Sequence, residues 1–157
     1  MLKMADLLRI HAAPGRVEWI GLRPARHADL LPVEAAILAE DGLEGDHARP
    51  GKRAVTLIQA EHLPVIAALC GREDVPPEML RRNIVISGIN LTALRHNRLG
   101  LGGAEIEFAA PCGPCSRMER ALGKGGYNAM RGHGGWCAQV LVPGTVSIGD
   151  EIAPIFD

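Results

Sequence analysis

The stretch Ala138-Gln139-Val140-Leu141-Val142-Pro143-Gly144-Thr145-Val146-Ser147-Ile148-Gly149-Asp150-Glu151-Ile152-Ala153-Pro154-Ile155 decides the fold class of this chain. It holds three short apolar runs, residues 138–142, 145–148 and 151–155, separated by Pro143-Gly144 and Gly149-Asp150. Closely spaced strands with Pro and Gly turns are typical of antiparallel β structure, closed into a barrel or stacked as a sandwich. The sequence therefore predicts a mainly β protein with a few helices.

Further strands are expected upstream of this stretch. Residues 104–108 alternate, with Glu105 and Glu107 on one side and Ile106 and Phe108 on the other, as a half-buried strand requires. Apolar residues predict strands at 54–58 and 84–86, and a strand pair at 17–22 and 30–38, although 34–38 also suits a helical turn. Residues 99–102 read as a turn.

Three helical segments are expected. In residues 59–69, Leu63, Ile66, Ala67 and the following Cys70 share one helical face, which predicts core packing for that face. A helical turn is expected at residues 78–80, and a short helix at 117–122. Ser116 with Glu119 matches the capping-box pattern at the start of the latter helix, and Gly123 is a good helix stop.

Length and composition limit the class of protein. A chain of 157 residues suits one domain, residues 1–157, with a sizeable core. The net charge of -1 gives no global attraction to nucleic acid or membrane, so any anion binding must be local. No apolar run has the length of a membrane span, and the start of the chain lacks a signal-peptide core, which predicts a cytoplasmic protein whose four cysteines are thiols.

The segment Pro111-Cys112-Gly113-Pro114-Cys115-Ser116-Arg117-Met118-Glu119 has the composition of a functional site. Cys115 would stand just before a helix, where unpaired N–H groups and the helix dipole favour a thiolate, with Arg117 adding positive charge. Cys115 is thus the best candidate for a reactive sulfur. The alternative is a CxxC pair whose thiols are inert and partly buried.

Basic and glycine-rich residues around this segment could bind an anion. Arg81 and Arg82 precede a strand and are either a solvated strand end or a pair of donors for an anion. Residues 123–135 hold six glycines with Lys124 and Arg131, and either form an anion-binding loop or a plain turn with solvated cations. His47 could donate a proton or bind a ligand, although a lone loop histidine is more often structural.

Two other arrangements of the cysteines remain open. Cys112-x2-Cys115-x17-His133-x3-Cys137 has ligand types and spacing suitable for a tetrahedral zinc site, which would make the chain a zinc-stabilised binding domain. Alternatively, Cys112 could resolve a persulfide on Cys115 as a disulfide. A thioredoxin-like protein would also need a βαβ unit around the motif, which these strands do not offer.

Five motifs, taken in order, resemble the MOSC domain, which is named for the C-terminal part of molybdenum cofactor sulfurase. The resemblance covers roughly residues 17–152. The motifs are Gly42-Leu43-Glu44-Gly45-Asp46-His47, Arg53-Ala54-Val55-Thr56-Leu57-Ile58, Arg81-Arg82-Asn83-Ile84-Val85-Ile86-Ser87-Gly88-Ile89-Asn90-Leu91, Pro111-Cys112-Gly113-Pro114-Cys115 and Gly144-Thr145-Val146-Ser147-Ile148-Gly149-Asp150.

This resemblance implies a distorted closed β-barrel with peripheral helices and a sulfurtransferase-like role in which Cys115 carries sulfur as a persulfide. The molybdenum cofactor or a molybdoenzyme would be the acceptor, and a separate pyridoxal-phosphate cysteine desulfurase the donor. The resemblance equally allows a cofactor-binding module or reductase component in which Cys115 is the molybdenum ligand. Residues implied to bind the cofactor are Arg81, Arg82, Asn83, Arg117, Lys124, Arg131 and His47.

Overall fold

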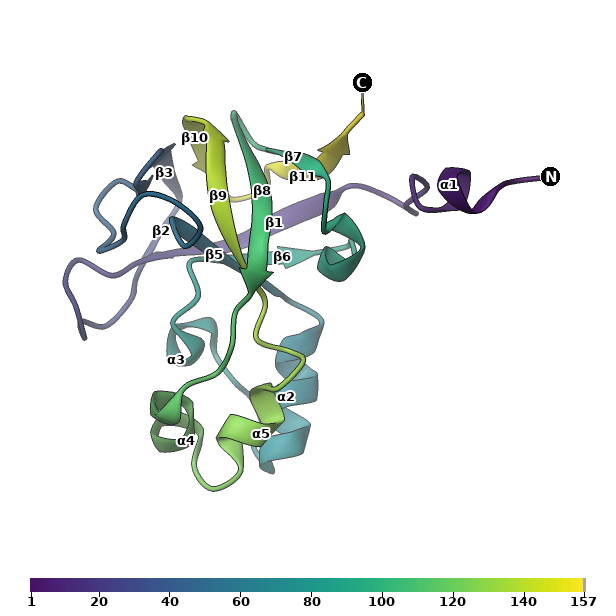
Figure 1. The fold of residues 1–157 in the computed structure, drawn as a ribbon. Helices are drawn as coiled ribbons and strands as arrows, with labels where there is room; N and C mark the ends of the chain where they lie inside the picture. Colours follow the sequence, from purple (N-terminus) through teal and green to yellow (C-terminus); the bar gives the residue numbers. More distant parts are fainter. Residues whose placement is uncertain (157) are drawn as a thin grey trace.

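Seven strands close into a barrel at the centre of the molecule (Figure 1), in a computed structural model that describes residues 1–156. Their order around the barrel is β11-β7-β8-β9-β5-β6-β1, and pairing of β1 with β11 closes it. Among these pairs only β5 and β6 run parallel. The predicted closed barrel is confirmed. Its strands are β1 (Gly15–Leu22), β5 (Val55–Gln59), β6 (Ile84–Ser87), β7 (Arg98–Leu101), β8 (Ala104–Pro111), β9 (Trp136–Val142) and β11 (Glu151–Ile155).

A second, three-stranded sheet of order β10-β3-β4 lies beside the barrel. It consists of β3 (Ala35–Ala39), β4 (Gly42–Leu43) and β10 (Gly144–Ser147). The three predicted C-terminal strands therefore all form, but β10 leaves the barrel to pair with β3. Gly144 permits this crossing, because a Cβ there would collide with the carbonyl of Gly103.

Two strand predictions need correction. The single strand expected at residues 30–38 is divided at Glu34: β2 (Leu31–Val33) pairs with β1, whereas β3 pairs with β10, so no helical turn forms. Residues 99–102, expected to be a turn, belong mostly to β7. Leu99 and Leu101 are fully buried in the barrel, so pairing with β8 and β11 outweighs the local glycine signal.

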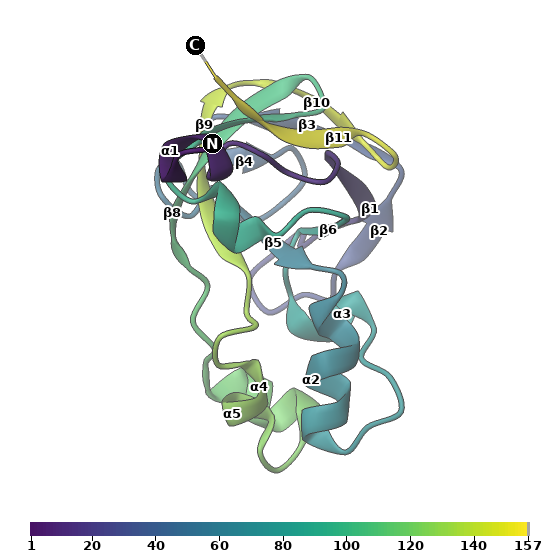
Figure 2. The same cartoon turned by 90° about the vertical axis from the view of Figure 1, so that its right-hand side faces the viewer.

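The α-helices between residues 62 and 130 gather at one end of the barrel in both ribbon views (Figures 1 and 2). α2 (His62–Cys70) buries Ile66 and Ala67 and packs Leu63 and Cys70 against the same core, as predicted. α3 (Pro77–Leu80) and α4 (Ser116–Leu122) also form where expected. α5 (Gly126–Met130) replaces part of the glycine-rich loop expected at 123–135, because Ala129 and Met130 are buried.

The predicted capping box is wrong. Cys115 is the N-cap of α4, Ser116 is already helical, and no side chain caps this helix. The Glu119 carboxylate instead accepts hydrogen bonds from the backbone N–H groups of Gly125 and Tyr127, at 2.9 and 3.0 Å. Glu119 thus caps the following helix, α5, and connects it to α4.

Two apolar clusters hold these parts together. One fills the barrel interior. The other lies between the barrel and the helices, where Ile58 and Val85 from the strands meet Ile66, Met118 and Met130 from the helices. Because Met118 is 1% exposed, this second cluster fixes α4, and with it the cysteine segment, against the end of the barrel.

The chain begins with α1 (Met4–Leu7), which projects away from the barrel in Figure 1, and a short 3-10 helix spans Leu91–Leu94. Within residues 1–156 no helix has the length and apolarity needed to cross a membrane.

Candidate functional site

A cleft of about 660 Å³ opens where the barrel meets the helices. Its walls come from segments far apart in the sequence: the loop after β1, the loop between β4 and β5, the residues just before β6, the segment after β8, the first turns of α4, and β9. Within the cysteine segment 112–115, Cys112, Gly113 and Cys115 line this cleft.

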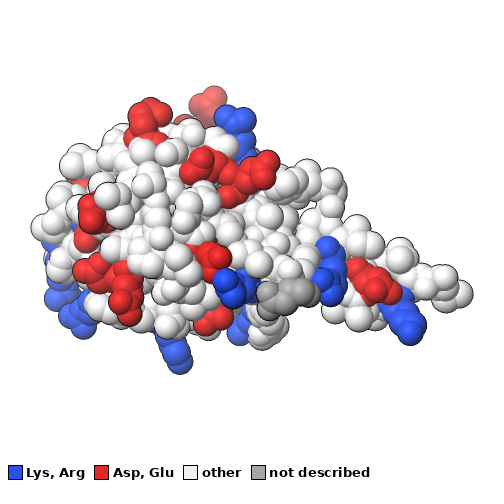
Figure 3. Space-filling view, turned by 90° about the horizontal axis from the view of Figure 1, so that it is seen from above, with Lys and Arg blue, Asp and Glu red and all other residues white. Residues whose placement is uncertain are grey.

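The lining of the cleft is strongly basic. Eight arginines line it and, among the described residues that do so, none is an aspartate or glutamate; the arginines are Arg23, Arg26, Arg49, Arg53, Arg81, Arg82, Arg117 and Arg120. The opposite end of the barrel, seen in Figure 3, carries acidic and basic side chains interspersed among uncharged ones. A chain with a net charge of -1 thus concentrates positive charge at one place, where guanidinium groups favour phosphate or carboxylate.

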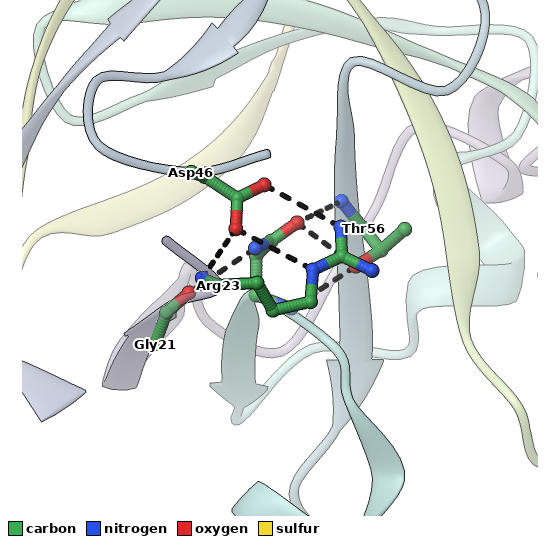
Figure 4. A network of polar contacts seen from close by, with 5 residues as sticks. Gly21, Arg23, Asp46 and Thr56 are labelled. Carbon is green, nitrogen blue, oxygen red and sulfur yellow. Dashed lines mark hydrogen bonds and ion pairs between the residues drawn. The ribbon is translucent and has the colours of Figure 1, made fainter. Parts of the chain in front are cut away.

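Asp46 holds two walls of the cleft together (Figure 4). Its side chain is fully buried. The carboxylate accepts a hydrogen bond from the Arg23 backbone N–H at 2.6 Å and forms an ion pair with the Arg23 guanidinium at 3.4 Å. The His47 N–H donates to the Arg23 carbonyl at 2.6 Å. These contacts place Arg23 and His47 side by side at the cleft, so Asp46 has a positioning role.

The side chain of Asn83 makes its hydrogen bonds to other residues of the protein. Its side-chain oxygen accepts hydrogen bonds from the Thr56 backbone N–H and hydroxyl, and its amide donates to the Gly21 carbonyl at 3.1 Å. With 1% of its surface exposed, Asn83 connects β1, β5 and β6 under the cleft. This arrangement explains an asparagine at that place without a ligand.

Arg82 fits neither of the alternatives given for the arginine pair. It is 8% exposed, and its guanidinium donates to the carbonyls of Gly134 and Leu80 at 2.8 Å each and to that of Cys112 at 3.5 Å. Gly134 lies so close that a Cβ there would collide with the Cys112 carbonyl. Arg82 therefore anchors the cysteine segment to the start of β9.

Arg81, by contrast, lines the cleft, and its side chain makes no hydrogen bond or ion pair with the other residues that the structure describes. It adopts a left-handed backbone conformation with φ of +60°. Burial and the neighbouring Arg117 and Arg23 lower the pKa of Arg81 from its usual value. Arg117 likewise contacts the ring of His27, and its charge is the main cause that lowers the pKa of His27. The cleft thus gathers cations that repel one another, which an anion would relieve.

Three cysteines line the cleft in two different states. Cys115 is exposed at the N-terminal end of α4, as expected. Cys112 and Cys137 form a close pair with sulfurs 2.9 Å apart, so Cys112 contacts Cys137. The hydrogen bond from the Cys112 thiol lowers the pKa of Cys137 to about 7, with help from Arg53 and Arg82 and against the effect of burial. Donating that bond, together with burial, raises the pKa of Cys112.

The predicted site residues are only partly brought together. Cys115, Arg81, Arg82, Arg117 and His47 line the cleft, whereas Lys124 and Arg131 do not. Arg131, at the C-terminal end of α5, contacts the Asn128 side chain instead. The basic lining residues that the sequence did not point to as site residues are Arg23, Arg26, His27, Arg49, Arg53 and Arg120. Arg120 lies on α4, and the others cluster in two polar loops, residues 23–27 and 49–53, which was the available signal.

The four residues of the possible zinc site are not assembled. Within residues 1–156 no group of three or more His, Cys, Asp or Glu side chains is placed to hold a metal ion. The Nδ1 of His133 lies 3.2 Å from the Ala129 carbonyl, and its ring packs edge-on against His62 at 5.1 Å. His133 therefore has partners of its own, away from the Cys112–Cys137 pair.

Fold and cleft together define a closed β-barrel protein with thiols in an arginine-lined cleft. Residues 10–153 match the family model of the MOSC domain, and the chain belongs to this family, which is linked to molybdenum cofactor sulfurase-like proteins. A search of curated protein sequences gives no match.

Solved structures with a similar fold include the YuaD protein from Bacillus subtilis, with 20% identity and a TM-score of 0.77 over 89% of this chain and 94% of that one. YiiM from Escherichia coli has 22% identity and a TM-score of 0.72 over 90% and 70% of the two chains. YiiM from Geobacillus stearothermophilus has 17% identity and a TM-score of 0.74 over 91% and 76%. At these identities the likeness establishes the fold alone.

Proposed function

We propose that this protein carries sulfane sulfur as a persulfide on Cys115, for the maturation of the molybdenum cofactor or another metal–sulfur centre. The observation that carries the proposal is an exposed thiol in a cleft lined by eight arginines and, among the described residues, by no carboxylate. Sulfur transfer needs an accessible thiolate, because the thiolate attacks the terminal sulfur of the donor.

Cys115 has the accessibility that a protein donor requires. It stands at the end of the cysteine segment, and α4 behind it is fixed by buried Met118. A rigid base under an exposed sulfur lets the active site of a cysteine desulfurase approach while the sulfur keeps its position relative to the arginines. Arg117, two residues on, also lines the cleft and is one of the cations nearest to Cys115 in the chain.

The cleft also suits the acceptor. A pterin that carries a phosphate needs cationic donors for the phosphate and a space of ordinary ligand size, roughly 300–1,000 Å³. Arg81, Arg117 and Arg23 would hold the phosphate, since they repel one another in its absence. When bound, the molybdenum cofactor would supply the metal centre that receives the sulfur. Lys124 and Arg131 have no place in this proposal.

The second candidate is a cofactor-holding protein in which Cys115 is the molybdenum ligand. The same cleft favours it, because a soft thiolate beside phosphate-binding arginines provides both kinds of contact such a cofactor needs. In that case the sulfur of Cys115 stays bound to the metal and is not transferred.

Intact-mass measurement after incubation with a cysteine desulfurase and free cysteine tests the proposal. We expect wild type and Cys70→Ala to gain one sulfur atom that a reductant removes, and Cys115→Ala to gain none at that position. Cys70 is a suitable control because it lies on α2, outside the cleft lining. A folded wild type that gains no sulfur would refute the carrier function, and stoichiometric molybdenum in protein from cells that make the cofactor would then favour the second candidate.

A further inference from the structure

The Cys112–Cys137 pair is a second sulfur site in the cleft, distinct from Cys115. The two sulfurs lie 2.9 Å apart. A disulfide has a length of about 2.05 Å, so the pair needs to close by only about 0.9 Å to form a covalent bond. Both residues line the cleft, where Cys112 is half-buried and Cys137 is buried, with 3% of its surface exposed.

The backbone holds both thiols in place. The Cys112 N–H donates to the Gly135 carbonyl at 2.8 Å, and Arg82 holds the Cys112 carbonyl from the other side. Cys137 lies in β9, paired with Ala110 on one side and Thr56 on the other. Cys112 directly follows β8 and is held by these hydrogen bonds, and Cys137 lies within β9, so the backbone already brings the two sulfurs to 2.9 Å.

The charges around the pair favour a thiolate. Arg53 and Arg82 both act on the two sulfurs from the wall of the cleft. One thiol of the pair donates to the other, so the pair can lose one proton while the second stays shared between the sulfurs. A dithiol in this state contains both a nucleophile and a resolving thiol.

We propose that Cys112 and Cys137 form a dithiol centre that reduces sulfane sulfur entering the cleft to hydrosulfide and is itself oxidised to a disulfide. The proposal deepens the proposed function by assigning a release step for the same cargo, and rests on that function only for the nature of the cargo. It does not require that Cys115 delivers the sulfur.

The chemistry balances in two steps. The Cys137 thiolate attacks the terminal sulfur of a persulfide R–S–SH. A new S–S bond forms between Cys137 and that sulfur, the S–S bond of the persulfide breaks, and RS⁻ leaves with the electron pair and takes a proton from water. The Cys112 thiol then gives its proton to water, and its sulfur attacks that of Cys137. The Cys112–Cys137 bond forms and HS⁻ leaves with the electron pair, so two electrons pass from the dithiol to the sulfane sulfur.

The test uses fully reduced protein, freed of reductant and treated with one equivalent of cysteine persulfide. Released hydrosulfide is quantified, and non-reducing proteolysis with mass spectrometry locates the disulfide. We expect linked Cys112 and Cys137 peptides in amounts that match the hydrosulfide, in wild type and in the Cys70→Ser control alike. The Cys112→Ser variant should keep the added sulfur on Cys137, because it lacks the thiol that forms the disulfide. Its release of hydrosulfide should be lower than that of wild type by on the order of tenfold or more.

The outcomes separate this proposal from the carrier function. A Cys112–Cys137 disulfide that still forms in Cys115→Ser supports the dithiol centre, even if desulfurase loading of Cys115 fails. A main product that links Cys115 to either partner, or a folded wild type whose Cys112 and Cys137 stay reduced while hydrosulfide is absent, overturns it. If Cys112→Ser unfolds, the location of the disulfide in wild type decides the question alone.

Discussion

Replacing Arg82 by alanine should destabilise the fold and loosen the cysteine segment. The Arg82 guanidinium is nearly buried and donates to three carbonyls, those of Gly134, Leu80 and Cys112. These carbonyls belong to three separate segments that meet under the cleft. Their loss therefore affects the position of Cys112 as well as the stability of the protein.

The magnitude follows from the contacts. Two of the bonds are 2.8 Å long and the third is 3.5 Å, so only two are strong. A hydrogen bond from a charged group contributes about 1.5–3 kcal/mol, but removing the side chain also removes the cost of burying its charge. We expect the free energy of unfolding to fall by about 2–4 kcal/mol and the melting temperature by roughly 10 °C.

Urea denaturation followed by circular dichroism measures this change, with Arg81→Ala as the matched control. Arg81 makes no side-chain hydrogen bond within the described residues, so its removal should change the free energy of unfolding by less than about 1 kcal/mol. Equal losses in the two variants, or a loss below about 1 kcal/mol in Arg82→Ala, would refute the anchoring role.

Three further predictions concern the groups around the cleft. Asp46→Asn should lower the free energy of unfolding by about 2 kcal/mol through the weakened contacts to Arg23. By contrast, Asp41→Asn, at an exposed position in the turn before β4, should be neutral by denaturation. Because Arg117 lowers the pKa of His27, an anion in the cleft should raise it; calorimetry should then show phosphate affinity increasing as pH falls through that pKa, an increase that His27→Gln abolishes. Hydrogen bonds from Tyr127 and Gly125 lower the pKa of Glu119, so Glu119→Ala should lower the melting temperature at neutral pH and have no effect once pH falls below the Glu119 pKa.

Much of the fold was readable from local pattern. Period-two alternation at 104–108 placed Ile106 and Phe108 inside the barrel, and Pro and Gly between the C-terminal runs marked the ends of β9, β10 and β11. The wrong strand predictions lie where the pairing with other strands determines whether a segment is a strand. β7 carries a glycine that reads as a turn, and residues 30–38 serve two different sheets. Strand identity there depends on distant strands, which local sequence does not report.

The candidate site was predicted less completely. Cys115 and Arg117 were identified because thiol, helix start and charge stand next to one another in the chain. Arg23 and Arg53 reach the cleft only because β1 and β5 bring their loops together, and the contact between Cys112 and Cys137 exists only because β8 and β9 are neighbours. The sequence spacing of the two cysteines suggested zinc ligands instead.

The sequence by itself therefore determined the mainly β class, the approximate places of α2, α3 and α4, the local concentration of thiols, and the exposed position of Cys115 before a helix. These features depend on residues within one or two turns of each other. Tertiary structure alone decided that Arg82 and Asn83 are structural, that Lys124 and Arg131 lie outside the cleft, and that eight arginines surround one cavity. The burial and the electrostatic environment of a site depend on residues from the whole chain that the barrel brings together, so a short segment of sequence does not reveal them.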